Sequence, residues 1–286
     1  MSEALRPATH ARHYAEPPQK TDPDGSRHWI TRAANFVTVV SQTPAGAVLA
    51  RNNPDEYMVL LPPGTEAVAE AAGTRIETKG DSLIIVPPGE SQVLVRKPGT
   101  VVRVFSNKAK DVAAAAVNAA TYADGAPEVA PLIPWPDPVG GFALRHYDLS
   151  KITSPDPHPL KMRVFRSTNL MINVFMPWTT RRDEKRLSPH SHADFEQMSL
   201  SLKGSFVHHL RYPWSPDKTH WREDEHVQYD ESPSVLVIPA GVIHTSQDVG
   251  QGTTWLVDIF APPRLDFSLK AGFVLNASEY PVPKTQ

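Results

Sequence analysis

The chain contains no cysteine. Without thiols it cannot form disulfides, thiolate metal sites or a cysteine nucleophile, so any metal must be held by histidine, aspartate or glutamate. The sequence also lacks an excess of either charge, because 29 Lys and Arg against 31 Asp and Glu give a net charge of −2. This balance argues against a dedicated nucleic-acid-binding protein and gives no general attraction to anionic membranes.

Long apolar runs are missing as well. No run approaches the ~20 residues that a membrane helix requires, and the first residues carry no apolar stretch typical of a secretory signal. We therefore expect no membrane partner and a cytoplasmic location, with which the absence of cysteine agrees. The sequence contains no phosphate-binding loop, dinucleotide fingerprint, zincin motif or nucleophile elbow, which argues against the common nucleotide-binding and hydrolase classes.

Proline, in contrast, is abundant, with 29 among 286 residues. Most prolines separate short β-prone runs, such as 57–61, 83–86 and 101–105 in the first half and 197–202 and 235–238 in the second. Short strands at regular intervals, cut by turns, predict an all-β sandwich or barrel.

Two features divide the chain. An alanine-rich stretch, 108–122, predicts a helix, and a proline-rich linker follows it at 126–141. The segment 82–89 matches 234–241 without a gap, which indicates a repeated unit. We therefore predict an N-terminal arm (1–27), a first β unit (28–107), a helix with its linker (108–141) and a second β unit (142–286).

Histidine and glutamate gather in one segment of the second unit. His190 and His192 are two residues apart, so on a strand their side chains share a face. Glu196 follows in the same segment, and His244 comes just after a strand and a tight turn. Three imidazoles and one carboxylate suit a single divalent first-row transition metal. An octahedral ion held by four such ligands keeps two positions open for a substrate or dioxygen.

This arrangement, His-x-His-x3-Glu followed by Pro-x-Gly-x2-His, resembles the paired motifs of the cupin superfamily. The resemblance implies an all-β fold of two tandem cupin (double-stranded β-helix) barrels joined by a short helix. It also implies that His190, His192, Glu196 and His244 hold the metal, with Fe(II) or Mn(II) favoured and Ni, Zn or Cu as alternatives. The glycine usual before the first motif histidine is absent, which does not touch the ligands. Relatives commonly bury sheet faces against another subunit, so the resemblance further implies a homodimer.

The first unit lacks these ligands. The equivalent positions are predicted to hold Arg51, Asn53, Tyr57 and Gln92. Arginine cannot bind a cation and the other three are weak ligands for these metals, so we expect this degenerate unit to be metal-free. Its role is open between packing or dimerisation and the binding of a second organic anion by these side chains.

The pocket around the metal is predicted from strand alternation. Period two after Glu196 places Met198 and Leu200 in the barrel interior, and the same reasoning makes Trp255 a pocket wall. Such a lining suits a small aromatic or branched organic substrate, with ordinary core packing as the alternative.

Two further histidines are candidates for proton transfer. His208 and His209 lie on a strand whose phase the sequence does not fix, so one of them is expected to face inward. An acid–base role is the functional interpretation and a hydrogen-bonded core histidine is the structural one.

Three functions fit these features. The first is a metal-dependent dioxygenase acting on a small aromatic or carboxylate-bearing molecule, favoured by the open metal positions and the apolar lining. The second is a non-redox isomerase or lyase in which the metal polarises the substrate. The third is a non-catalytic binding or sensor protein, for which no appended DNA-binding unit is visible.

Overall fold

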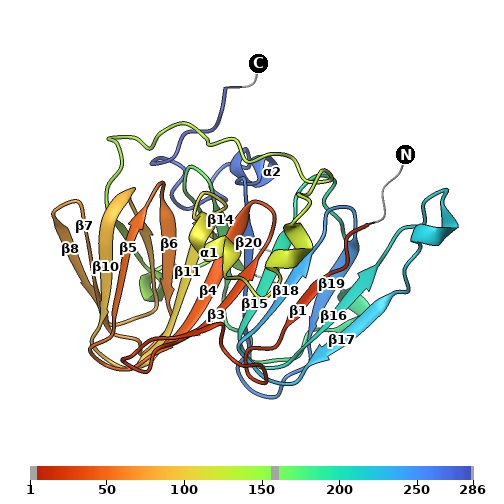
Figure 1. The fold of residues 1–286 in the computed structure, drawn as a ribbon, viewed down its shortest axis with the longest axis horizontal. Helices are drawn as coiled ribbons and strands as arrows, with labels where there is room; N and C mark the ends of the chain where they lie inside the picture. The colour runs from red at the N-terminus through yellow and green to blue at the C-terminus, as the bar shows by residue number, and fades with distance from the viewer. Residues whose placement is uncertain (1–4, 156–160, 285–286) are drawn as a thin grey trace.

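A computed structural model describes residues 5–155 and 161–284 of the chain, and strands dominate it (Figure 1). The described helices are short. They are α1 (Lys110–Ala114), α2 (Leu265–Ser268) and the 3-10 turns η1 (Ala119–Tyr122), η2 (Leu149–Lys151), η3 (Glu184–Arg186) and η4 (Lys218–His220). No helix in the described part is long and apolar enough to cross a membrane. The all-β prediction is confirmed.

Two large antiparallel sheets form the centre of the molecule. The sheet of the first half runs in the order β12 (Arg145–Asp148), β9 (Ser82–Val86), β6 (Tyr57–Leu61), β11 (Gly99–Ser106), β4 (Phe36–Thr43), β3 (Arg27–Arg32) and β2 (Lys20–Thr21). The sheet of the second half runs in the order β1 (Thr9–Ala11), β18 (Ser234–Ile238), β15 (Gln197–Lys203), β20 (Trp255–Phe260), β14 (Met171–Phe175) and β13 (Met162–Arg166). Apart from β2, the two orders correspond strand by strand.

A smaller sheet accompanies each large one. In the first half it consists of β5 (Val48–Asn53), β10 (Gly89–Val95), β7 (Ala67–Ala71) and β8 (Thr74–Thr78). In the second half it consists of β19 (Ile243–Asp248), β16 (Phe206–Arg211) and β17 (Glu225–Tyr229), and an isolated bridge between His190 and His244 takes the place of β5. The repeat seen in the sequence is therefore a repeat of two paired sheets.

The four sheets form four layers, with the two large sheets facing each other in the middle. One continuous apolar cluster joins these large sheets and contains Met58 and Leu60 of β6 together with Met198 and Leu200 of β15. A second cluster fills the space between the large and small sheets of the first half. Both faces of each large sheet are thus buried, and this double burial decides the orientation of the site residues.

Each half lends a strand to the other. The N-terminal strand β1 pairs with β18 of the second half, and β12, beyond the linker, pairs with β9 of the first half. Figure 1 shows β1 in red beside the blue strands of the second half. The described part of the predicted arm therefore reaches the second half of its own chain.

The helix predicted over 108–122 is wrong in length. The chain forms α1, leaves the helix and returns in η1, because side chains and backbone of this stretch bond to β3 instead. Asn118 accepts from the backbone N–H of Arg32 at 3.0 Å and donates to its carbonyl at 2.8 Å. Tertiary hydrogen bonds of this kind override alanine helix propensity, which is worth under about 1 kcal/mol per residue.

Candidate metal centre

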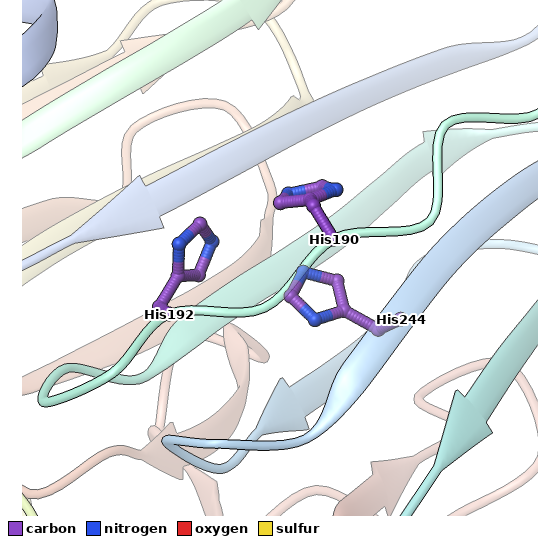
Figure 2. A group of neighbouring side chains, drawn as sticks. All are labelled: His190, His192 and His244. Atoms are coloured by element: carbon purple, nitrogen blue, oxygen red, sulfur yellow. The ribbon is translucent and has the colours of Figure 1, made fainter.

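Three histidines converge where the small and large sheets of the second half approach each other. One imidazole nitrogen from each of His190, His192 and His244 lies within 4.8 Å of the other two. Figure 2 shows His190 and His192 on the segment before β15, with His244 reaching them from β19. The antiparallel bridge between His190 and His244, with N–O distances of 3.1 and 2.8 Å, fixes the two backbones side by side.

Backbone carbonyls orient two of the rings. Nδ1 of His190 lies 2.9 Å from the carbonyl of Ser188, and Nδ1 of His244 lies 2.9 Å from that of Val242. A carbonyl only accepts, so each Nδ1 donates and each neutral ring keeps its lone pair on Nε2. Burial lowers the pKa of His244 to about 3 and that of His192 to about 4, so both rings are neutral at pH 7.

Gln197, the first residue of β15, completes the group. Its side-chain oxygen lies 3.0 Å from Nε2 of His192 and 3.3 Å from Nε2 of His244. Its amide nitrogen donates to Ser199, whose hydroxyl donates to Asp258 at 2.6 Å, and this chain fixes which end of the amide faces the imidazoles.

At His244 the two converging atoms are therefore both acceptors. Nε2 of His244 and the oxygen of Gln197 both present lone pairs, which repel unless a cation lies between them. Imidazole nitrogens and an amide oxygen are ligands that first-row divalent metals accept. The donor set of this group consequently fits a metal ion, with three histidines and one neutral oxygen as its protein ligands.

Glu196 is not part of the group, contrary to the sequence prediction. Its carboxylate accepts hydrogen bonds from the backbone N–H of Ala34 at 2.6 Å and from the hydroxyl of Tyr122 at 2.9 Å, both in the first half of the chain. Glu196 and Gln197 are neighbours at the start of a strand, so their side chains point to opposite faces. Glu196 faces the interface between the halves, and Gln197 faces the site.

The first half contains a glutamate in the same situation. Glu56 directly precedes β6 as Glu196 precedes β15, and its carboxylate accepts from the N–H of Thr168 at 3.1 Å and from Tyr280 at 2.9 Å. Both carboxyls are buried, which raises the pKa of each. The two glutamates thus make reciprocal contacts across the interface. An alignment of Glu56 with Glu196 would have marked Glu196 as an interface residue in the sequence and left its neighbour Gln197 to face the site.

The predicted pocket residues also face the interface. Met198, Leu200 and Trp255 belong to the apolar cluster between the two large sheets and do not line the site. Alternation from Glu196 does hold, since Glu196, Met198 and Leu200 share one face, but after the bend at 193–194 that face meets the interface and not the site. A shift of one residue exchanges the two faces of a strand.

The cavity at the histidines has a volume of about 340 Å³. Aromatic side chains form much of its wall, namely Phe175, Trp178, Phe260, Phe267 and Phe273. Three cationic side chains also line it, Arg182, Arg264 and Lys270. Such a lining suits a small anionic molecule with an apolar part.

Asp258 is the acidic residue of this cavity. Burial is the main cause that raises its pKa to about 6, and the hydroxyl of Ser199 opposes this by donating to the carboxylate. A carboxyl that titrates near neutrality exchanges protons readily at physiological pH. Its position on β20 makes it a candidate acid–base group that the sequence did not identify.

The two candidate acid–base histidines face opposite ways. His208 is fully buried, with Nδ1 2.8 Å from the hydroxyl of Ser246, whereas Nε2 has no hydrogen-bond partner. His209 points outward and contacts His226 at 2.8 Å and Gln247 at 3.2 Å. Neither lines the cavity at the histidines, so the structure places neither His208 nor His209 against a substrate there.

No protein-family model matches this sequence, and no curated protein does. The fold, however, is shared with solved structures. Escherichia coli Ylba aligns with a TM-score of 0.60 at 10% identity, covering 92% of this chain and 95% of that one. AerE from Microcystis aeruginosa aligns with 0.56 at 11%, covering 91% and 99%. Bacillus subtilis oxalate decarboxylase, whose Mn(II) centres are the subject of its structure, aligns with 0.59 at 12%, covering 100% and 90%. The chain therefore has the all-β cupin fold that the sequence motifs predicted.

Proposed function

We propose that this chain is a metal-dependent bicupin enzyme, a dioxygenase acting on a small organic anion. In this proposal His190, His192 and His244 hold one divalent ion, with Gln197 beside them. The convergence of three imidazoles on the wall of an aromatic cavity with cationic side chains carries the proposal. Fe(II) is the preferred ion for oxygen chemistry and Mn(II) the alternative, which also occurs in the oxalate decarboxylase neighbour.

The donor set favours an anionic substrate. Three imidazoles and an amide are neutral, so a divalent ion keeps its full charge, unlike one bound to a carboxylate. The ion would supply Lewis acidity and, if redox-active, the means to activate dioxygen. Arg182 and Arg264 line the same cavity, and Arg182 is held in place by hydrogen bonds to Ser246 and Ser188 at 2.7 and 2.8 Å. These cations would bind and orient the carboxylate of the substrate.

The aromatic wall supports an oxygen-using reaction. Phe175, Trp178 and Phe260 exclude water from one side of the cavity and provide faces for an aromatic ring. This wall takes the role that the sequence prediction gave to Met198 and Leu200.

Asp258 supports a second candidate, a non-redox isomerase or lyase. Its carboxyl is buried, lines the cavity and has a pKa of about 6, which suits a group that removes and returns a proton. In this alternative, Asp258 is the base, and the ion stabilises the charge that develops on the substrate.

Oxygen dependence separates the two candidates. Protein loaded anaerobically with Fe(II) or with Mn(II) is screened against small aromatic and aliphatic carboxylates, with oxygen uptake and product formation recorded together. Dioxygenation predicts that turnover stops without oxygen and that label from isotopic O2 enters the product. Undiminished turnover without oxygen assigns the isomerase or lyase instead. His190→Ala should abolish turnover, whereas His226→Ala, an exposed histidine on the outer face of β17, should leave it unchanged.

A homodimer and a cytoplasmic location complete the proposal. The dimer rests on the analogy with relatives of this fold. Light scattering of the purified chain tests it, and a monomeric mass would refute it.

A further inference from the structure

The first half contains a cavity in the same place as the metal cavity of the second. It lies between its large and small sheets, has a volume of about 380 Å³ and is lined by Arg51, Arg103, Phe105 and Leu49, among others. Its polar lining consists of three cationic side chains, two carboxylates and His28, and the rest of its wall is apolar.

The charges of this cavity do not balance. Lys20 pairs with Asp22 at 2.6 Å, and Arg51 pairs with Asp111 at 2.8 Å. Arg103 has no such partner in the part of the chain that the structure describes, and its Nε is inaccessible to solvent without a hydrogen bond. Its guanidinium lies 5.8 Å from the centre of the Phe105 ring.

Arg103 is half-buried, and its inaccessible Nε has lost contact with water without gaining a hydrogen-bond acceptor. A polar group removed from water without a hydrogen-bond partner is unfavourable, so this position favours an incoming acceptor. A carboxylate bound to the guanidinium would provide the missing acceptors, in the two-bond geometry that arginine favours. Arg103 therefore has the properties of a residue that binds an anionic ligand.

Strand register relates this cavity to the metal site. Arg51 pairs with Ser91 as His190 pairs with His244, so Arg51 occupies the position of a metal ligand. Arg103 lies opposite Val59 on β6 as Asp258 lies opposite Ser199 on β15, so Arg103 occupies the position of Asp258. Side-chain cations in the first half thus stand where a metal ligand and an acid stand in the second.

We propose that the cavity of the first half is a metal-free binding site for a small aromatic monocarboxylate, held by the guanidinium of Arg103. The carboxylate pairs with Arg103, while Arg51, also on the cavity wall, stays paired with Asp111. The ring packs against apolar walls that include Ile30, Leu49 and Phe105. This site is independent of the reaction proposed for the second half.

Methyl NMR of the full-length protein distinguishes the two cavities, because each contains its own reporters. Ile30 and Leu49 line the cavity of the first half, and Leu256 lines that of the second. Benzoate is the probe, titrated into isotope-labelled protein. Saturable shifts of the Ile30 and Leu49 methyl signals are expected.

Three variants test the role of Arg103. Arg103→Met should weaken benzoate binding at the Ile30 and Leu49 methyls about tenfold or more, since a charge-assisted contact is lost. Arg103→Lys keeps the charge but not the paired donors, so it should weaken binding less. Arg27→Met removes a nearby arginine that contacts Trp29 and does not line the cavity, and it should bind as the wild type does.

Three results would overturn the proposal. These are an absence of shifts at Ile30 and Leu49 in the wild type, shifts confined to Leu256, and unchanged affinity in a folded Arg103→Met. If Arg103→Met does not fold, the Arg103→Lys and Arg27→Met pair decides, and equal affinity in both would also contradict it.

Discussion

The two halves share one strand order but fill their interiors differently. The face of β6 that packs against the small sheet carries Tyr57, Val59 and Leu61. The corresponding positions of β15 in the second half are Gln197, Ser199 and Ser201. On the small sheets, Ala69 and Val93 stand opposite each other in the first half, where His208 and Ser246 do so in the second.

The two interiors therefore differ in how much they contribute to the stability of the fold. The first interior is a continuous apolar cluster, which stabilises the fold by about 25 cal/mol per Å² of apolar surface removed from water. The second interior breaks into small clusters around polar groups, several of which lack hydrogen-bond partners. Such polar burial is costly and is expected where a site binds or reacts. Packing of the large sheets against each other supports the more polar half.

Removal of the proposed metal ligands should have the largest effect on the difference between the two halves. His190→Ala and His244→Ala should each reduce metal affinity more than about 100-fold, because they delete direct ligands of the proposed ion. The register equivalents Arg51→Ala and Ser91→Ala should leave metal content unchanged. Elemental analysis after dialysis measures it, and full metal retention in both histidine variants would refute the site.

The neighbours Gln197 and Glu196 test which face of β15 holds the metal. Gln197→Ala should weaken metal binding about 10–100-fold, whereas Glu196→Ala should change it less than about twofold, because its carboxylate faces Ala34 and Tyr122. Competition with a chelating dye gives both affinities. Stronger weakening by Glu196→Ala than by Gln197→Ala would restore the ligand set predicted from the sequence.

The two interface glutamates should behave alike despite belonging to different halves. Glu196→Ala and Glu56→Ala each leave a buried N–H and a tyrosine hydroxyl without their acceptor, which costs about 2–4 kcal/mol. Urea unfolding of metal-free protein measures the loss. A loss confined to one of the two variants would show that the two glutamates do not play equivalent roles at the interface.

His208, unlike its equivalent Ala69 in the first half, should make the free energy of unfolding depend on pH in the acid range. Burial lowers the pKa of His208 to about 3, whereas an unfolded histidine titrates near 6.5. The neutral ring therefore contributes stability that is fully present above pH 6.5 and is lost as the pH falls toward 3, because the unfolded chain binds the proton more tightly.

His208→Leu should consequently flatten the pH dependence of the free energy of unfolding by about 1.4 kcal/mol per pH unit in that window. Urea titrations of metal-free protein at about pH 6.5, 5.5 and 4.5, which span this window, measure the slope of the free energy of unfolding against pH. His209→Leu, on the outer face, is the matched control and should leave the slope unchanged. Equal slopes for the wild type and His208→Leu would show that His208 is not held neutral by burial.

Much of the site was accessible from the sequence because its signals are local. Alternating apolar runs, proline-rich turns and the repeat of 82–89 in 234–241 predicted two repeated all-β units. The spacing of His190 and His192, with His244 after the matching turn, predicted the three imidazoles that the structure brings together. The alignment of Gln92 with His244 was wrong by one residue, since Ser91 holds the equivalent pairing position.

What the sequence determined by itself was which segments become strands and which of them carry imidazoles, since both follow from residue types and their spacing. The tertiary structure alone decided which face of each strand looks into the site. Where one face of a sheet is exposed to solvent, the alternation of apolar and polar residues shows which face is buried. Both faces of β15 and β20 are buried, so this signal is absent. On β15 the apolar residues pack between the halves and the polar ones face the site, whereas β20 turns Leu256, Asp258 and Phe260 to the cavity. Met198, Leu200 and Trp255 therefore hold the two halves together, while Gln197, Ser199 and Asp258 surround the histidines.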